Sequence, residues 1–273
     1  MPTFLVTGSN TGIGRAVVEA LAAAGGNVVL ASRSAERTLP VVEGIRRQHP
    51  DIDARFLQVD LSDFDSVRRA AGEYLASGHP LDVLVNNAAV AGTFGRSRQD
   101  YDLTIATNHL GPFLFTNLLL PRLEQSGAAR IVNVASAAHL SVKTIDWSHL
   151  SRGPASGLSG YRAYALTKLM NVLHAKELAR RLADRQVTTC ALHPGVVASD
   201  LWRPIPAPLP WIMKLFMISN ERGAKTPVWC ATAPEVVSGR YYDKCREAVC
   251  SPLADDRDLA RELWARSEEA VRG

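Results

Sequence analysis

A glycine-rich turn, Thr7-Gly8-Ser9-Asn10-Thr11-Gly12-Ile13-Gly14, follows the first apolar run of the sequence and opens a predicted helix over residues 13–24. Glycine permits a tight turn there, and it lets backbone N–H groups and the positive end of a helix approach a pyrophosphate. The spacing is G-x-x-x-G-x-G instead of G-x-G-x-x-G. Because a strand precedes the turn and a helix follows it, we expect residues 8–14 to contact a dinucleotide.

The same alternation of short apolar runs and longer periodic segments continues along the chain. Further buried strands are predicted at residues 28–30, 56–57, 83–85, 131–134 and 190–192, with helices near 40–48, 64–75, 104–123 and 162–183. Right-handed crossovers between such strands predict a doubly wound α/β Rossmann fold, a parallel sheet of about seven strands with helices on both faces. No second domain boundary precedes residue 200, so we expect one domain over residues 1–273.

The character of the sequence changes after residue 200. Four prolines lead into an apolar stretch at 211–218, which at eight residues is too short to span a bilayer. Three interpretations remain open: a helix packed on the core, a substrate lid within 200–225, or a membrane-surface patch. A closing amphipathic helix is predicted over 256–271.

Composition excludes several classes of protein. The chain has 31 Lys+Arg against 27 Asp+Glu, and these basic residues are scattered, so we expect no nucleic-acid partner. An apolar fraction of 47% argues against disorder, and the four cysteines form no C-x-x-C pair and are interpreted as free thiols. The first residues run directly into a strand, so we expect no signal peptide, no transmembrane segment and a cytoplasmic protein.

The end of the second predicted strand indicates which dinucleotide binds. Proteins that prefer NAD usually carry Asp or Glu about 20 residues past the glycine turn. Here the sequence at 30–34 is Leu-Ala-Ser-Arg-Ser, without an acid. Arg33 can form a charge-assisted, bidentate pair with a 2′-phosphate, so we predict NADP(H). The alternative is that Arg33 is an ordinary solvated loop residue.

Tyr164 and Lys168 lie four residues apart on a predicted helix and therefore share one face. A phenol has a pKa of about 10, and a neighbouring ammonium lowers it toward the range useful in acid–base catalysis. Such a pair also occurs by chance on many helices. Ser136 and His139 suggest a hydrolase instead, but the sequence shows no sharp nucleophile turn and no oxyanion site.

The motifs taken together resemble the short-chain dehydrogenase/reductase family over essentially the whole chain. They occur in the family's order: the glycine turn, Asp60, Asn86-Asn87-Ala88-Ala89, Asn108, Ser136, the pair Tyr164 and Lys168, and Pro194-Gly195. The usual Asn-Asn-Ala-Gly ends here in Ala89, a small-for-small change that we expect to be tolerated. The segment of 28 residues from Ser136 to Tyr164 is similar to that of the retinol dehydrogenase, protochlorophyllide reductase and WW-domain oxidoreductase branch.

The resemblance implies roles for these residues. Tyr164 would donate the proton to a carbonyl, and Ser136 would hydrogen-bond the substrate oxygen. Lys168 would bind the nicotinamide ribose and lower the pKa of Tyr164. Asn108 would hold a water in a proton relay. For the cofactor, the resemblance implies adenine contacts from Asp60 and Leu61, ribose contacts from Asn87 and Ala88, and carboxamide contacts from Pro194, Gly195, Val196 and Val197. Asn86 would bridge strands, and no metal is expected because the nicotinamide carries the hydride.

The predicted activity is reversible, NADPH-dependent reduction of an aldehyde or ketone on a hydrophobic small molecule. Trp147 and the other apolar residues of 137–163 and 200–220 would wall the substrate pocket. Two alternatives are an NADPH-dependent C=C reductase and a non-catalytic NADP(H)-binding interaction protein. Family members often pair through the helices that correspond to 104–123 and 162–183, which implies a homodimer or homotetramer.

Overall fold

The structure, a computed structural model, describes residues 1–151, 160–195 and 218–272. An eight-stranded sheet lies at its centre in the order β3-β2-β1-β4-β5-β6-β7-β8. The neighbouring strands from β3 to β7 run parallel, whereas β8 pairs antiparallel with β7. The strands are β1 (Thr3–Thr7), β2 (Asn27–Ser32), β3 (Ala54–Gln58), β4 (Val83–Asn86), β5 (Ala129–Val134), β6 (Val187–His193), β7 (Tyr241–Asp243) and β8 (Arg246–Glu247).

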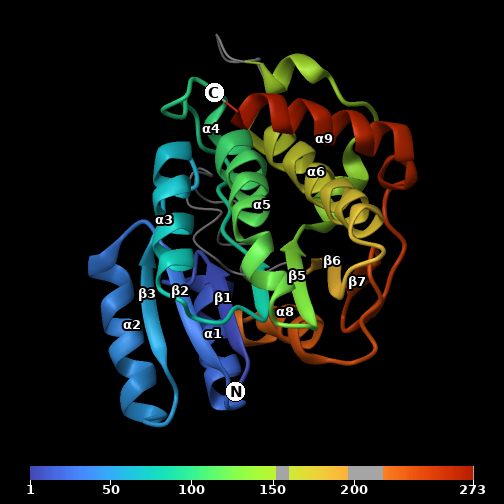
Figure 1. Ribbon diagram of the computed structural model, residues 1–273. Coiled ribbons are helices and arrows are strands. Elements are labelled where there is room, and N and C mark those ends of the chain that lie inside the picture. Colours follow the sequence, from blue (N-terminus) through green and yellow to red (C-terminus); the bar gives the residue numbers. More distant parts are fainter. Residues whose placement is uncertain (152–159, 196–217, 273) are drawn as a thin grey trace.

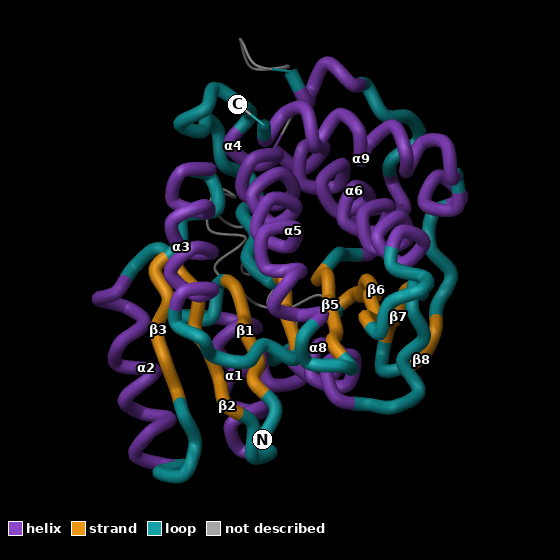
Figure 2. The backbone as a smooth tube through the Cα atoms, viewed as in Figure 1, coloured by secondary structure: helices purple, strands orange, loops and turns teal. Residues whose placement is uncertain are grey.

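Helices cover both faces of this sheet, and Figure 2 shows its strands grouped below α5, α6 and α9 in that view. Phe4 and Val6 of β1 belong to one apolar core together with α1 (Gly12–Ala23), α2 (Ala35–Gln48) and α8 (Asn220–Thr232). Leu5, between them, points to the opposite face and joins the core formed with α3 (Phe64–Ala76), α5 (Gly111–Glu124), α6 (Gly160–Arg181) and α9 (Arg257–Val271). Because successive side chains of a strand face opposite ways, a strand buried on both sides reads as a continuous apolar run. The predicted doubly wound α/β fold is confirmed, and β8 is an addition to it.

Two helices differ from the prediction by more than a shift of one or two residues at their ends. α2 begins at Ala35 instead of residue 40, because the Ser34 side chain accepts a hydrogen bond from the Arg37 N–H and caps the helix. The segment predicted as one helix over 104–123 consists of α4 (Leu103–Ile105), a π-helical turn η1 (Ala106–Leu110) and α5. Such turns arise where a helix takes in one extra residue, and they often mark functional positions. Here the turn carries Asn108.

The predicted closing helix is confirmed as α9, whose first turn is capped by the Asp256 side chain. Figure 1 shows α9, in red, lying across α6, and α9 also contacts α5. It therefore occupies part of the surface through which we expected two copies to pair, and homo-oligomer formation stays a prediction. The apolar stretch at 211–217 and most of the 200–225 lid segment lie outside the described residues, and no helix within the described ranges is long and apolar enough to cross a membrane.

Two buried histidines join α9 to the helices beneath it. His109 of η1 shares a hydrogen bond of 2.8 Å with Ser267 Oγ of α9, and His174 of α6 packs against Phe113 and Trp264 with ring centroids 5.3 and 5.7 Å away. Burial and the neighbouring His174 lower the pKa of His109 to about 3, and burial lowers that of His174 to about 4. Both rings are therefore neutral in the folded protein at neutral pH.

We expect the free energy of unfolding to fall by roughly 3–6 kcal/mol between pH 7 and pH 4 because of these two residues. The unfolded chain protonates them near pH 6.5, whereas the folded chain does not until about pH 4 or below, so acid favours unfolding. Urea unfolding of the wild type and His174→Leu at several pH values checks this. The variant should show a shallower decline, and an unchanged slope would contradict the prediction.

Candidate active site

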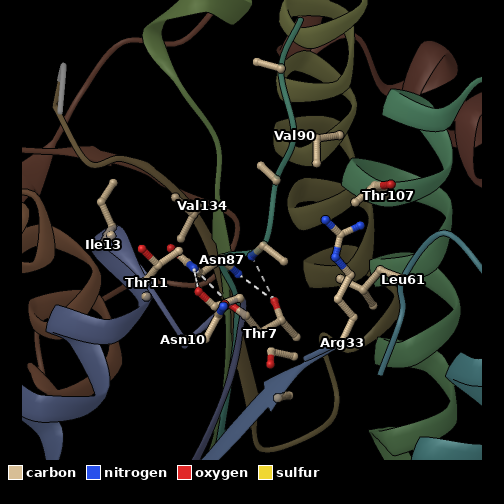
Figure 3. Close-up of a pocket in the computed structure, with 18 of the residues that line it drawn as sticks. Thr7, Asn10, Thr11, Ile13, Arg33, Leu61, Asn87, Val90, Thr107 and Val134 are labelled. Carbon is tan, nitrogen blue, oxygen red and sulfur yellow. Dashed lines mark hydrogen bonds between the residues drawn. The ribbon is translucent and has the colours of Figure 1, made fainter. Parts of the chain in front are cut away.

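A pocket of about 460 Å³ lies where β1, β2, β4 and β5 end, the edge of a parallel sheet at which ligands usually bind. It is lined by most of the predicted cofactor and catalytic residues: Gly8, Asn10, Thr11, Gly12, Ile13, Gly14, Arg33, Asp60, Leu61, Asn87, Ala88, Tyr164, Lys168 and Pro194. Figure 3 shows the glycine turn with Asn10, Thr11 and Ile13 on one side of this pocket and Arg33 with Leu61 on the other. Residues far apart in the sequence thus share one cavity.

The glycine turn is built for close backbone approach. Gly8 and Gly12 have φ angles of +67° and +58°, which favour glycine, and a Cβ on Gly14 would lie 2.5 Å from Asn87 Nδ2 and closer still to the Gly8 carbonyl oxygen. Asn87 holds the turn in place, because its Nδ2 donates to the Thr7 carbonyl at 2.8 Å (Figure 3). Ser9 does not line the pocket; its buried Oγ has no hydrogen-bond partner within the described part of the chain.

Two glycine-to-alanine changes separate the role of this turn from the general effect of the substitution. Gly14→Ala should destabilise the protein by about 1–3 kcal/mol, because the new methyl group has to displace backbone, and it should also weaken dinucleotide binding. Gly44→Ala in α2 meets open space, so it should stabilise the protein by about 0.5–1 kcal/mol. Thermal unfolding and cofactor titration measure both effects, and equal effects of the two variants would contradict this account.

Arg33 lies directly after β2 and extends its guanidinium toward the pocket (Figure 3). Arg37, in the first turn of α2, lines the same cavity, and so does Ser34 between them. Within the described ranges neither guanidinium forms an ion pair with a carboxylate. Sequence reasoning missed Arg37, although a second basic residue four positions after Arg33 was the available signal.

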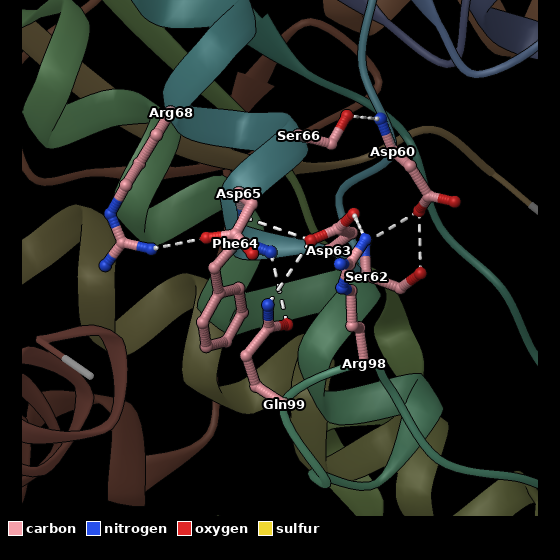
Figure 4. A network of polar contacts seen from close by, with 9 residues as sticks. All are labelled: Asp60, Ser62, Asp63, Phe64, Asp65, Ser66, Arg68, Arg98 and Gln99. Carbon is pink, nitrogen blue, oxygen red and sulfur yellow. Dashed lines mark hydrogen bonds and ion pairs between the residues drawn. The ribbon is translucent and has the colours of Figure 1, made fainter.

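Asp60 follows β3 and lines the pocket beside Leu61. Its carboxylate accepts hydrogen bonds from the backbone N–H and the hydroxyl of Ser62, at 2.9 and 2.6 Å, and its own N–H donates to Ser66 Oγ (Figure 4). These bonds tie the Asp60 loop to the start of α3. Asp60 and Leu61 thus line the same pocket as the glycine turn, and their contact with an adenine stays a prediction.

Tyr164, Lys168 and Ser136 come together although they lie on two different elements. Tyr164 and Lys168 project from one face of α6, are both almost fully buried, and both line the pocket. Ser136 follows β5, and its side chain hydrogen-bonds with that of Tyr164. Lys168 Nζ donates to the Val134 carbonyl at 2.7 Å and lies 5.4 Å from the centroid of the Tyr164 ring.

The pKa of Tyr164 is raised in this arrangement, and the lowering by Lys168 that the resemblance implied stays a prediction. Burial raises the pKa of Tyr164 to about 12, and the hydrogen bond with Ser136 offsets only part of that rise. Burial also lowers the pKa of Lys168 to about 7. The low-dielectric surroundings disfavour both charged forms, so Lys168 is a weak source of positive charge for a phenolate. Tyr164 is therefore held as a neutral phenol.

Asn108 is buried behind the pocket. Its Oδ1 accepts the Val90 N–H at 2.8 Å, and its Nδ2 donates to the Val90 carbonyl at 2.8 Å and to Thr167 Oγ1 at 3.2 Å. Thr167 in turn donates to the Tyr164 carbonyl at 2.7 Å. The side-chain amide thus connects the loop after β4 to the turn of α6 that carries Tyr164. The second lone pair of Oδ1 is the side-chain position that these bonds leave for the predicted relay water.

Asn86 matches its predicted structural role. Its Nδ2 donates to Thr116 Oγ1 of α5 at 2.9 Å and to Asn133 Oδ1 of β5 at 3.1 Å. Because Asn86 and Asn133 are partners in the register of β4 and β5, this bond crosses directly between the two strands.

The remaining predicted positions divide into three groups. Pro194 lines the pocket, and Gly195 follows it with a φ of +95°. Val196 and Val197 lie outside the described residues, as do the apolar residues at 201–202 and 211–216 that we expected at the substrate pocket. Trp147 stacks with Arg266 of α9 and does not line the pocket at the glycine turn, because its 3₁₀ turn (Trp147–Leu150) packs against α9. Its place at a substrate pocket stays a prediction.

Several pocket residues carry no distinctive signal in the sequence. They are Ala31, Ser32, Ser34, Val59, Val90, Ala91, Thr93, Thr107, Val134 and Ala135. Most are small or apolar residues at strand ends, and only their position relative to the glycine turn brings them to the cavity.

Comparison with known proteins identifies the class that this fold and site define. The model of the short chain dehydrogenase family matches residues 2–149. The chain belongs to that family, which supports a carbonyl/alcohol oxidoreductase. It is similar to dehydrogenase/reductase SDR family member 13 of Bos taurus, with 39% identity over 98% of this chain and 72% of that protein. Retinol dehydrogenase 11 of Homo sapiens is 37% identical over 95% of this chain and 82% of its own length. The predicted resemblance to the retinol dehydrogenase branch is thereby confirmed.

Solved structures agree with the fold. An uncharacterized protein from Mycobacterium paratuberculosis superposes with a TM-score of 0.78 and 28% identity, covering 100% of this chain and 94% of that one. A 3-oxoacyl-(acyl-carrier-protein) reductase from Agrobacterium tumefaciens, solved with NADP bound, has a TM-score of 0.71 and 25% identity over 88% of this chain and 91% of its own.

Proposed function

We propose that the protein is an NADP(H)-dependent oxidoreductase that reversibly reduces an aldehyde or ketone of a hydrophobic small molecule. The observation that carries the proposal is that Tyr164, hydrogen-bonded to Ser136, lines the same pocket as the glycine turn and Arg33. A proton donor and a nucleotide cradle therefore face one cavity.

The residues present fit a nicotinamide dinucleotide. The backbone at Gly8, Gly12 and Gly14 leaves the close approach that a pyrophosphate needs, and a Cβ at Gly14 would close it. Arg33 and Arg37 supply two guanidinium groups for a 2′-phosphate. A bound dinucleotide supplies the hydride in this chemistry. The family match and the NADP bound to the Agrobacterium reductase support this choice of cofactor.

The protein's own part in the reaction is to hold the carbonyl and deliver a proton. Tyr164 Oη is a neutral phenol, because burial raises its pKa to about 12, so the proton to be donated is present at neutral pH. Ser136 Oγ, which hydrogen-bonds with Tyr164, is placed to donate to the same substrate oxygen. Lys168, whose Nζ donates to Val134, is placed to reach ribose hydroxyls from the wall of the pocket. In the oxidative direction Tyr164 would accept the proton instead.

A hydrophobic alcohol or aldehyde is the substrate class that we favour. The similarity to retinol dehydrogenases, whose names state an apolar alcohol as substrate, supports this class. The pocket wall next to Tyr164 also includes Val90, Ala91 and Ala135, which are apolar.

A substrate panel tests the proposal. Purified protein is assayed for NADPH consumption with aldehydes, ketones and quinones, and the products are identified. An alcohol product supports carbonyl reduction, whereas a saturated C–C bond would establish the C=C reductase alternative. NADPH binding without any product over the panel would favour the non-catalytic alternative.

A further inference from the structure

One peptide group next to the active site is held at both ends by histidine side chains. It is the group that joins Ser136 to Ala137, directly after β5. His139 Nδ1 lies 2.6 Å from its carbonyl oxygen, that of Ser136. Its N–H, that of Ala137, donates to Nδ1 of His193 at 3.3 Å. The two imidazoles come from different elements, His139 from the 3₁₀ turn Ala137–Ser141 and His193 from the last residue of β6.

The partners of each ring fix where its proton lies. The backbone N–H of Ser251 donates to His139 Nε2 at 3.0 Å, so that nitrogen must be the bare acceptor. The proton of neutral His139 then lies on Nδ1 and is donated to the Ser136 carbonyl. His193 is the reverse case, since its Nδ1 accepts from Ala137 and its proton must lie on Nε2. The arrangement therefore requires two neutral rings of opposite tautomers.

Each ring is anchored in turn by a different part of the fold. His139 is fully buried, and its ring packs on Tyr241 of β7 with centroids 4.9 Å apart. His193 directly precedes Pro194, which lines the cofactor pocket. The same peptide group is thus tied to the segment after β8 through Ser251 and to the Pro194 loop through His193.

We propose that His139 and His193 are positioning residues, which orient the Ser136 hydroxyl toward the substrate carbonyl by clamping the 136–137 peptide group between them. The inference deepens the proposed function, because it rests on Ser136 acting on the substrate oxygen. The backbone of Ser136 is extended, with φ and ψ of −166° and 153°. Rotation of the clamped peptide group would change this ψ angle and the backbone next to the side chain, and with them the direction of the Ser136 hydroxyl. The Ser136 Oγ accepts the Ala138 N–H at 3.2 Å and also hydrogen-bonds with the Tyr164 side chain, so the hydroxyl is held beside the proposed proton donor.

The clamp is tested by variants that remove the Nδ1 atoms of His139 and His193 and by variants that restore a polar group near each position. His139→Leu and His193→Leu should each lower kcat about 10- to 100-fold and leave KM for NADPH within about twofold. His139→Asn restores a donor and His193→Asn an acceptor near the Nδ1 position, so both should recover most of the lost kcat. His174→Leu removes a histidine that is buried like His139 but packs on Phe113 and Trp264 instead, and it should keep wild-type kcat. Unchanged kcat in the Leu variants, or a loss that Asn does not restore, would overturn the proposal.

A pH profile distinguishes the clamp from a purely structural role. Protonation of His193 at Nδ1 turns an acceptor into a donor and breaks its bond to Ala137, so wild-type kcat should decline on the acid side. The charged or titratable groups that act on His193 are Asp243 and Lys244 of the β7–β8 hairpin, His139 and Lys168. Lys176 acts in the same way on His139. His193→Asn cannot take up this proton and should lose that acid limb, measured over the range in which circular dichroism shows folded protein. An identical limb in wild type and variant would count against the clamp.

A measurement without turnover keeps this inference separate from the proposed function. Long-range ¹H–¹⁵N spectra of the protein report the tautomer of each histidine, and they should show Nδ1–H for His139 and Nε2–H for His193. The opposite tautomers would overturn the clamp even if the enzyme were active. The expected tautomers in a protein that reduces no carbonyl would instead refute the proposed function, and with it the role of the two histidines in orienting Ser136 toward a substrate.

Discussion

Tyr164→Phe is expected to lower kcat for carbonyl reduction by about 10²- to 10⁴-fold, the usual contribution of a positioned general acid. The change removes a single oxygen from a side chain that is 6% exposed, so the fold should tolerate it. Without that oxygen the substrate carbonyl loses its proton donor, and Ser136 loses one of its hydrogen-bond partners. Steady-state NADPH oxidation with the best substrate of the panel measures the effect.

The matched control for this change lies one helical turn earlier. Tyr161 is 54% exposed, also belongs to α6, and does not line the pocket. Tyr161→Phe should therefore keep kcat within about twofold. Full activity in Tyr164→Phe, or an equal loss in both variants, would refute the assignment of Tyr164 as proton donor.

Arg33→Asp is expected to lower the ratio of kcat/KM for NADPH to that for NADH by about 100-fold or more. A hydrogen bond to a charged group contributes about 1.5–3 kcal/mol, which corresponds to roughly 10- to 100-fold in affinity, and a carboxylate at this position would also repel the 2′-phosphate. Arg37→Ala should have a smaller effect in the same direction, about tenfold, because Arg33 would still be present.

Arg47→Asp controls for the change in net charge. Arg47 is exposed in the last turn of α2 and does not line the pocket, so the substitution should leave the cofactor preference unchanged. A preference that stays the same in Arg33→Asp would show that the 2′-phosphate is not recognised there. A shift of equal size in Arg47→Asp would mean that overall charge, and not a local pair, selects the cofactor.

Local pattern in the sequence was sufficient for the fold and for much of the candidate site. Strands buried on both faces are continuous apolar runs, such as Phe4-Leu5-Val6, and the glycine turn between strand and helix marks the nucleotide cradle. The four-residue spacing of Tyr164 and Lys168 placed both side chains on one helical face, and the structure has both in the pocket. These features depend on the repeat of a strand or a helix along the chain, so the spacing of nearby residues in the sequence is enough to predict them.

Tertiary structure alone decided the features that depend on contacts between distant segments. Trp147 packs on Arg266 of α9, and the Asn108 side-chain amide hydrogen-bonds with Val90 and Thr167. The pKa of Tyr164 rises where the sequence suggested a fall, because burial disfavours the charged phenolate, and burial also disfavours the charged form of Lys168. His139, which the sequence offered only as a partner for a nucleophilic serine, instead donates to the Ser136 carbonyl, and its tautomer depends on Ser251, 112 residues away in the chain. Burial and long-range hydrogen bonds are set by packing, and no periodicity in the sequence encodes them.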